Sequence, residues 1–289
     1  MDNRLQNNAS IFFSRSNALS VNLVRNRDKT MPFIPKLDYP DNEKPNLALL
    51  ENLFREWHQR FTSTGSGLEK HVADGMVFDG FYPHYFSQKK RVLFVGQEAL
   101  EIAGHNYIEV LYKCYHSKDK RIGNQSLNRY KFHARMLHIA YGIVHEKPLW
   151  RDIPYASRIG DTFGMANGLS IAFMNISKLS NESGRSAADW NLINTAYRLS
   201  TEGRNFIREE VAILQPDIVI TMCLNDKIAS LGQLTKIHAS EKANSFWLDY
   251  DGHRALLIDT WHFSARRKKA VEDYYLPICD AIRRSETAI

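Results

Sequence analysis

Short apolar runs alternate along the chain with longer amphipathic segments. Four runs are rich in β-branched residues and have the continuous hydrophobicity of strands that are buried on both faces: 92–95 (VLFV), 169–174 (LSIAFM), 217–222 (DIVITM) and 255–259 (ALLID). Apolar residues at helical spacing fill the longer segments 45–61, 107–116, 126–144, 204–214 and 268–284. An Asp-Gly pair at 251–252 predicts a hairpin turn before the fourth run.

Strands that alternate with helices predict an α/β fold. We expect a three-layer α/β/α architecture, in which helices cover both faces of a central, mainly parallel, four-stranded sheet. The chain of 289 residues is long enough for one such domain, which we assign to residues 41–289. Residues 1–40 are assigned to a polar, basic N-terminal extension, with a transit peptide as the alternative reading of its first part.

Composition narrows the class of protein. Charged residues make up 24% of the chain and no apolar run approaches the roughly 20 residues of a membrane helix, so we expect a cytoplasmic protein that does not span a membrane. Three widely separated cysteines predict neither a disulfide framework nor a zinc knuckle, and they are fewer than the four thiolates that an iron–sulfur cluster usually takes. We expect no metal and no cofactor, and a monomer. A formal charge of +6 favours an acidic partner, most commonly nucleic acid.

Polar side chains follow three of the predicted strands. Gly96, Gln97 and Glu98 come directly after the first, Asn175 after the second, and His262 shortly after the fourth. Because sites in parallel sheets form beyond the carboxyl ends of the strands, we expect a carboxylate, an amide and an imidazole to meet at one edge. Each also has a purely structural interpretation, as a helix cap, a turn residue or a buried histidine.

Four segments, in this order and spacing, resemble the motifs of the uracil-DNA glycosylase superfamily: FVGQEA, FMNISKLS, LQPDIVITM and TWHFSAR. In that family a strand ends in Gly-Gln-Asp-Pro-Tyr or a relative, a second strand ends in Asn, and a late loop carries His-Pro-Ser. The resemblance covers roughly residues 90 to 285. It implies a glycosylase-like fold and a DNA substrate.

The resemblance also implies roles for the matching positions. Glu98 stands where the family has the group that positions the attacking water. Asn175 stands where an asparagine reads the polar edge of an extruded pyrimidine, and His262 where a histidine stabilises charge on the departing base. Gly96 would allow close approach of the backbone, and Gln97 would offer its backbone N–H to the base. Groups aimed at a developing oxocarbenium sugar and an anionic base lower the barrier to glycosidic cleavage.

The chain departs from the family pattern on the side of the pocket that faces the pyrimidine 5-position. Where one branch has Pro-Tyr, with the tyrosine closing this side, the chain has Ala99 and Leu100. We expect Leu100 and Tyr107 to line a base pocket there, although a tyrosine at a helix start also serves packing alone. An open 5-position favours a base larger than uracil.

The late motif has Phe263 in place of proline, followed by Ser264 and then by Arg266 and Arg267. We assign all four to DNA contact, with the arginines on phosphates and Phe263 in the space that a flipped nucleotide leaves. For the arginines, a solvated helix start is an equally good interpretation.

Three further residues are candidates for binding the nucleic acid. Lys178 and Arg185 follow the second strand and are assigned to DNA contact, and Phe163 is assigned to stacking on the base. A surface loop with one anchored aromatic is the alternative for Phe163. Segment 126–144 interleaves basic residues, Arg135 among them, with apolar ones, which leaves a basic DNA-contacting face or a solvated back of a core helix open.

The sequence thus predicts a monofunctional DNA glycosylase that flips out and releases a modified pyrimidine, such as a 5-substituted or glucosylated hydroxymethyl cytosine of phage DNA, with a role in antiviral defence. Uracil excision in DNA repair is the close alternative. A catalytically silent DNA-binding module is the second. A dinucleotide site and a serine hydrolase have less support, because neither Gly-x-Gly-x-x-Gly nor Gly-x-Ser-x-Gly occurs where it is needed.

Overall fold

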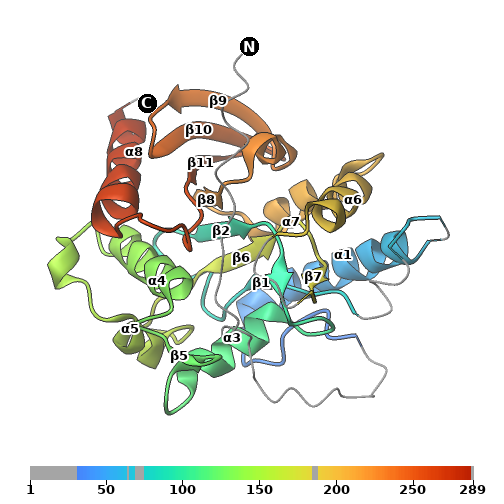
Figure 1. Ribbon diagram of the computed structural model, residues 1–289, viewed down its shortest axis with the longest axis horizontal. Coiled ribbons are helices and arrows are strands. Elements are labelled where there is room, and N and C mark those ends of the chain that lie inside the picture. The colour runs from blue at the N-terminus through green and yellow to red at the C-terminus, as the bar shows by residue number, and fades with distance from the viewer. Residues whose placement is uncertain (1–30, 64, 69–74, 184–187, 288–289) are drawn as a thin grey trace.

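A seven-stranded mixed sheet runs through the middle of the molecule (Figure 1). The computed structural model describes residues 31–63, 65–68, 75–183 and 188–287. The strand order is β1-β6-β2-β8-β11-β10-β9. The bounds are β1 (Gly80–Phe81), β2 (Val92–Gly96), β6 (Ala172–Asn175), β8 (Ile218–Met222), β9 (Gln233–His238), β10 (Ala243–Tyr250) and β11 (His253–Thr260).

The four inner strands β6, β2, β8 and β11 pair in parallel, and antiparallel strands extend the sheet at both sides. Successive side chains of an inner strand enter opposite cores, as a period of two requires: Phe94 packs on one face and Val95 on the other. This double burial explains the continuous apolar runs. The predicted α/β class is confirmed. The sheet has seven strands rather than four, because the added strands β1, β9 and β10 are too short or carry too many polar residues to form continuous apolar runs.

Helices cover both faces of the sheet (Figure 1). On the face that carries Phe94 lie α3 (Tyr107–His116), α4 (Lys131–Val144), α5 (Ala156–Thr162) and α8 (Leu276–Thr287). On the other face lie α1 (Lys44–Thr62), α6 (Trp190–Thr201) and α7 (Phe206–Leu214). Side-chain caps begin three of these helices: Asn106 accepts from the Glu109 N–H, Asp189 from Leu192 and Asn205 from Arg208.

The order in which the chain adds strands to the sheet reverses at β2, because β6 lies on one side of β2 and β8 on the other. The connection from β2 to β6 contains α3, α4 and α5, whereas the connection from β6 to β8 contains α6 and α7 on the opposite face. Strand β2 therefore lies at a topological switch point, between β6 and β8. In open α/β sheets ligands bind outside the carboxyl ends of the strands at such a point.

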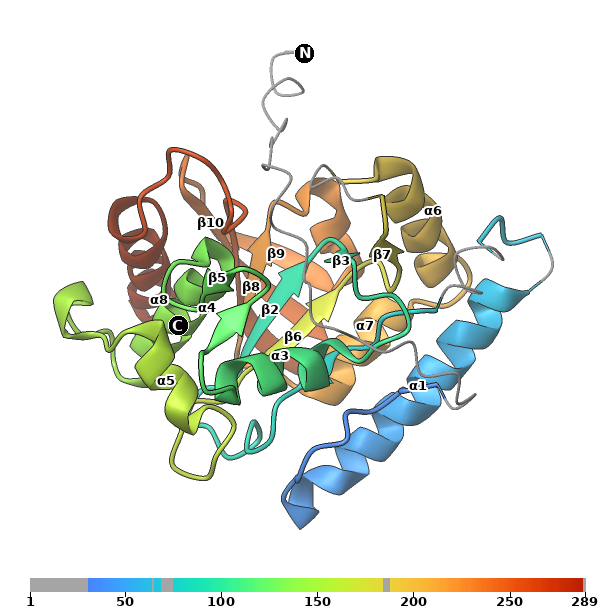
Figure 2. The same cartoon turned by 60° about the horizontal axis from the view of Figure 1, so that its bottom comes forward.

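Shorter elements complete the fold. Beyond the carboxyl ends of β2 and β6, β3 (Ala99–Leu100) and β7 (Ser180–Asn181) pair in parallel (Figure 2). The predicted hairpin is confirmed: β10 and β11 join through Asp251 and Gly252, whose φ angles of 44° and 76° suit a two-residue turn. The remaining elements are β4 (Arg121–Ile122), β5 (Gln125–Ser126), the 3₁₀ turns Asp41–Glu43, Trp150–Asp152 and Asn225–Ser230, and the π-helical turn η4 (Val271–Tyr275).

Residues 31–40 pack on the domain, although the sequence assigns them to an extension. The ring of Phe33 lies 5.0 Å from that of Phe78, and buried Tyr39 donates a hydrogen bond to the Phe81 carbonyl. The packed unit therefore includes residue 31 onward, and residues 1–30 lie outside the described part. Within the described ranges, no helix has the length and apolar character needed to cross a bilayer.

Candidate active site

Three of the predicted site residues leave the sheet at the same edge. Gly96 at the end of β2 pairs with Asn175 at the end of β6. His262 follows β11, whose last residue Thr260 pairs with Met222 at the end of β8. Since β8 lies between β2 and β11, the four parallel strands deliver all these groups to one side of the sheet. The strand ends therefore lie at one edge of the sheet, and the meeting of the three side chains stays a prediction.

Backbone and side-chain hydrogen bonds fix the region after β2. The carbonyls of Gly96 and Gln97 accept from the N–H groups of Ile176 and Ser177, at 3.1 and 2.9 Å. The Gln97 amide donates to the carbonyl of Cys223, just beyond β8, at 2.8 Å. Gln97 thus ties the ends of three neighbouring strands together. The Gln97 carbonyl and side-chain amide are therefore both engaged in hydrogen bonds within the protein.

Asn175 presents an unpaired amide at a buried position. The residue is 2% exposed, and its Nδ2 has no hydrogen-bond partner. Its Oδ1 lies 2.6 Å from the point that a Cβ at position 96 would occupy, so the side chain lies against Gly96, where only a glycine leaves room. Buried polar atoms are nearly always paired, so the unpaired amide makes Asn175 a candidate for binding a ligand.

Buried ion pairs hold the backbone of Asn175. Asp79 accepts a hydrogen bond from the Asn175 N–H at 2.8 Å and forms an ion pair with Lys178 at 2.5 Å. Lys178 also lies 2.6 Å from Glu210 of α7, and all three charged side chains are fully buried. The prediction that Lys178 contacts DNA is wrong, because its ammonium is enclosed between two carboxylates.

Glu98 is anchored through one oxygen and leaves the other unpaired. Oε1 accepts from the Asn181 amide at 3.3 Å and from the Asp189 backbone N–H at 3.2 Å, at the start of α6. Oε2 is buried and has no hydrogen-bond partner. Burial raises the pKa of the Glu98 carboxyl to about 6, and the two hydrogen bonds offset part of this rise. Glu98 is therefore ionised at neutral pH and poised to accept a proton in weak acid.

His262 is a neutral imidazole at neutral pH. Burial lowers its pKa to about 4, and the positive charge of Arg135 adds to this effect. Nδ1 accepts from the backbone N–H of Ser264 at 3.2 Å. In the neutral ring the proton then resides on Nε2, which is left as a donor. Ser264, predicted to contact DNA, serves here to fix the tautomer of His262.

A row of aromatic rings connects the ends of the site. Tyr107 at the start of α3 stacks on Phe173, with centroids 4.5 Å apart and planes 13° from parallel. The ring centre of Phe132 in α4 lies 6.2 Å from that of Phe173 and 5.4 Å from that of His262. Phe173 also closes on Gly96, where an added Cβ would come within 3.3 Å of its ring. Tyr107 therefore stands on the same face of the sheet as Asn175, two residues after Phe173.

Sequence reasoning missed Phe132 and Phe173. Phe173 has a local signal, because residues two apart on a strand share a face and Asn175 was already a candidate. Phe132 has no such local signal, because it lies in α4, far from His262 in the sequence, and contacts His262 only in the folded protein.

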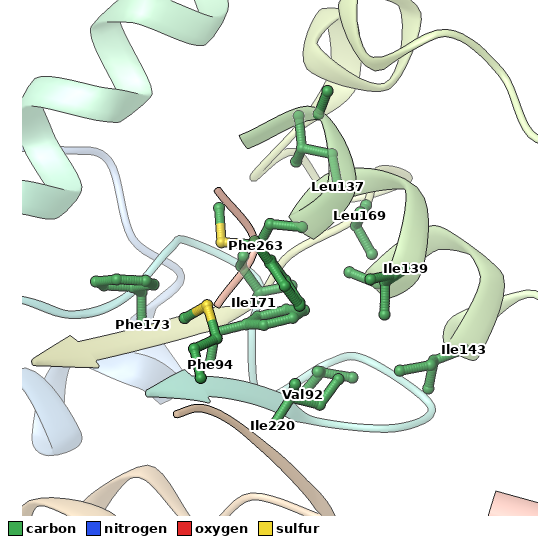
Figure 3. Close-up of a cluster of buried hydrophobic side chains, with 14 of the residues drawn as sticks. Val92, Phe94, Leu137, Ile139, Ile143, Leu169, Ile171, Phe173, Ile220 and Phe263 are labelled. Atoms are coloured by element: carbon green, nitrogen blue, oxygen red, sulfur yellow. The ribbon is translucent and has the colours of Figure 1, made fainter. Parts of the chain in front are cut away.

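Two aromatic residues predicted to contact nucleic acid belong to the core. Phe163 is fully buried between Tyr82 and Tyr115. The Tyr82 backbone N–H donates a hydrogen bond to the Ile171 carbonyl at the amino end of β6, so this cluster lies away from the candidate edge. Phe263 is fully buried between the sheet and α4, against Phe94 and Tyr274 (Figure 3). These two predictions are wrong, since aromatic character alone does not distinguish a stacking platform from packing.

The remaining predicted residues flank the edge. Leu100 is half-buried in β3, opposite Asn181, whose amide donates to Glu98. Arg266 and Arg267 are exposed in the loop after His262. Arg185 lies outside the described residues.

The site is covered rather than open. Asn175 and Phe173 are each 2% exposed, so a ligand reaches the amide only after neighbouring side chains separate. Two surface hollows, of about 470 and 340 Å³, lie elsewhere: one at the β10–β11 turn and one between α8 and the start of β10. Glu98 and Asn175 share no direct contact in the described part of the chain, and they are linked through the ends of β2 and β6.

The described residues contain no cluster of three or more His, Cys, Asp or Glu side chains that could hold a metal ion. The chemistry that the described groups themselves offer is that of a carboxylate, an amide and a neutral imidazole.

A scan against protein-family models finds no match to this sequence, and a search of curated proteins finds no relative. The resemblance to the uracil-DNA glycosylase superfamily therefore rests on the sequence motifs alone.

Proposed function

We propose that the protein is a monofunctional DNA glycosylase that extrudes a modified pyrimidine and hydrolyses its N-glycosidic bond. One observation carries the proposal: at the switch point of the sheet, the ends of β2 and β6 hold two buried polar atoms without partners, Glu98 Oε2 and Asn175 Nδ2. A carboxylate and an amide in this state suit a base and a water that enter together. The order of the four motifs adds support.

The three groups divide the work of the proposed reaction. The Asn175 amide pairs with the polar edge of the flipped base, and Tyr107 and Phe173 flank it. The ionised Glu98 orients the attacking water and offsets the positive charge that develops on the sugar. The Nε2–H of neutral His262 donates to the base as it departs with a negative charge. Water attacks the anomeric carbon and gives its proton to Glu98, the glycosidic bond breaks, and the electron pair leaves with the base.

Leu100 in place of a tyrosine is the feature that favours a 5-substituted base. The family's tyrosine excludes substituents at this position, and Leu100 is neither as large nor as rigid. We propose 5-substituted cytosine as the substrate, including glucosylated hydroxymethyl cytosine of phage DNA. A carboxamide offers both a donor and an acceptor, so Asn175 also suits uracil, which makes uracil excision the second candidate.

Base release from defined oligonucleotides tests the proposal. Single- and double-stranded oligonucleotides carry uracil, a thymine mismatch, 5-hydroxymethylcytosine or its glucosylated form, and abasic sites are scored by alkaline cleavage. We expect release from the 5-substituted cytosines. Release from uracil alone would select the second candidate, and inactivity on every oligonucleotide with intact DNA binding would favour a silent binding module.

Variants of the two unpaired groups sharpen the test. Asn175→Ala and Glu98→Gln should lower base release by about a hundredfold or more while sparing DNA affinity. Asn167→Ala and Glu241→Gln make the same chemical changes at exposed positions and should have no effect. The rate should rise as pH passes about 6, where Glu98 loses its proton, and this rise should vanish in Glu98→Gln.

A further inference from the structure

A buried arginine lies beneath the loop that carries His262. Arg135 of α4 is 6% exposed, although the sequence groups it with solvated basic residues of the same helix. Its guanidinium donates from Nη1 to the Phe263 carbonyl and from Nη2 to the Lys268 carbonyl, the latter at 2.6 Å. One planar fork thus holds both ends of the segment 263–268.

Tyr274 extends this hold to His262 itself. Arg135 Nη1 lies 3.3 Å from the Tyr274 hydroxyl, and the guanidinium carbon lies 4.6 Å from the centre of the Tyr274 ring. The same hydroxyl donates to the His262 carbonyl at 2.9 Å. Three loop carbonyls, those of residues 262, 263 and 268, are therefore tied to one cation directly or through one hydroxyl.

The charge of this cation is not neutralised by an ion pair. In the described part of the chain Arg135 forms no ion pair with a carboxylate, and its hydrogen bonds go to the Phe263 and Lys268 carbonyls and the Tyr274 hydroxyl. Asp273, whose charge reaches Arg135, is engaged by Lys242 at 3.0 Å and by the Lys269 backbone N–H at 2.8 Å. Arg135 is thus held by carbonyl and hydroxyl oxygens rather than by a carboxylate, and its positive charge lies inside the protein.

Two of the other titratable groups near His262, Cys223 and Tyr274, are neutral at neutral pH. The Cys223 thiol, beyond β8, accepts the His262 backbone N–H, and burial raises the pKa of this thiol. Burial also raises the pKa of the Tyr274 hydroxyl to about 12. The Lys268 ammonium lies over the Trp261 ring at 4.0 Å, and Phe132 is the aromatic neighbour from α4. Of these neighbours, Arg135 is the one whose charge lowers the pKa of the His262 imidazole.

We propose that Arg135 is a positioning residue for His262: its fork fixes the loop that aims the imidazole at the edge of the sheet, and its unpaired charge raises the positive potential where a departing base becomes anionic. The effect of the charge on the departing base rests on the proposed glycosylase activity. The fixing of the His262 loop by the guanidinium does not depend on that activity. Low-dielectric surroundings make such a charge more effective than it would be in water.

Two substitutions distinguish the effect of the positive charge at position 135 from the effect of the planar guanidinium that binds the loop carbonyls. Arg135→Met removes both, and Arg135→Lys keeps the charge but offers one ammonium in place of a planar fork. Arg198→Met, at an exposed arginine of α6, is the matched control. Base release is measured under single-turnover conditions, and the titration of His262 is followed by NMR of histidine-labelled protein, with His262→Gln used to assign its signal.

We expect Arg135→Met to lower the rate of base release by about a hundredfold with less than about a threefold change in DNA affinity, and to move the His262 titration toward that of free histidine. Arg135→Lys should keep the low titration and recover part of the rate. A folded Arg135→Met protein with unchanged rate and unchanged His262 titration would show that Arg135 merely packs.

A second variant covers the case in which Arg135→Met does not fold. Tyr274→Phe keeps the ring beneath the guanidinium and removes the hydroxyl that holds the His262 carbonyl. It should shift the His262 titration and the rate in the same direction by a smaller amount, and no shift in either would overturn the inference. If wild-type protein releases no base, the proposed function fails, whereas the NMR titration still decides the role of Arg135 in the loop.

Discussion

Gly96 shows how a single residue shapes the candidate site. Its backbone is extended and shows no positive φ, so its absent side chain matters for space rather than for conformation. The Asn175 amide and the Phe173 ring fill the place where a Cβ would stand. The glycine that ends β2 therefore lets the side chain from β6 lie across the end of its neighbour.

Gly96→Ala should damage function more than stability. The new methyl group would displace the Asn175 amide, which is the movable end of a side chain, so the unfolding free energy should fall by about 1 kcal/mol. Base release should fall by about a hundredfold, because a shift of the order of 1 Å in a reacting group has this effect. Gly160→Ala, in α5, meets Leu127 and the Tyr115 carbonyl at 3.3 Å and is the control. Base release at the wild-type rate in Gly96→Ala would contradict the placement of Asn175.

At the scale of elements, one buried charge network joins segments that are distant in sequence. Asp79 precedes β1, Lys178 follows β6 and Glu210 lies in α7. The Lys178 ammonium lies 5.4 and 5.1 Å from the ring centres of Phe54 and Trp57 in α1. Burial raises the pKa of Glu210, and the charge of Lys178 opposes this rise. The network fixes where β6 ends, and thereby the place of Asn175.

Lys178→Met should destabilise the protein by about 3 to 5 kcal/mol, because it leaves two buried carboxylates without their cation. The triple variant Asp79→Asn, Lys178→Met and Glu210→Gln should regain part of this loss, since no charge then remains unpaired. Urea unfolding measures both. DNA affinity per folded molecule should stay at the wild-type value in Lys178→Met, in contrast to a loss in Arg266→Ala. Unchanged stability with weakened DNA binding would instead place Lys178 on the DNA.

Across the whole molecule, buried histidines dominate the expected response to acid. Burial lowers the pKa of His133 to about 3 and that of His138 to about 4, and His262 behaves in the same way. The unfolded chain takes up protons near pH 6.5, where the folded state does not. These groups therefore contribute stability that is complete above pH 6.5 and is lost as pH falls toward 4. Carboxyl groups with a raised pKa, namely Glu43, Glu98, Glu210 and Asp259, have the opposite sign and offset part of this loss.

The unfolding free energy should fall by several kcal/mol between pH 7.5 and pH 5. His138 supplies the test, because its Nε2 is buried and has no hydrogen-bond partner. His138→Leu should keep the stability at pH 7.5 and reduce the slope below pH 6.5 by about 1 kcal/mol per pH unit. Urea unfolding at a series of pH values measures the slope. Parallel curves for the wild type and His138→Leu would show that His138 titrates normally in the folded state.

The sequence could predict what depends on local pattern. Continuous apolar runs gave the four inner strands because a strand buried on both faces has no polar side. Asp251-Gly252 gave its hairpin because few other residues adopt its φ angles. The residues after the strands gave the candidate edge, since parallel strands end together. Edge strands such as β9, which is polar and half exposed, carry no such pattern.

Partnerships between distant side chains could not be predicted. The sequence led us to interpret Lys178 and Arg135 as surface cations, because it does not show which carboxylates or carbonyls will enclose a charged side chain. Phe163 and Phe263 read as stacking residues for the same reason. Burial is a property of what the rest of the chain places around a residue.

The sequence by itself determined the α/β class, the inner strands and the polar groups that leave them, because strand periodicity and turn chemistry act over a few residues. Only the tertiary structure decided which polar atoms remain unpaired, which cations are buried and which rings meet His262. Those depend on contacts across up to 139 residues of chain, as between Arg135 and Tyr274, and such contacts exist only once the two faces of the sheet are packed.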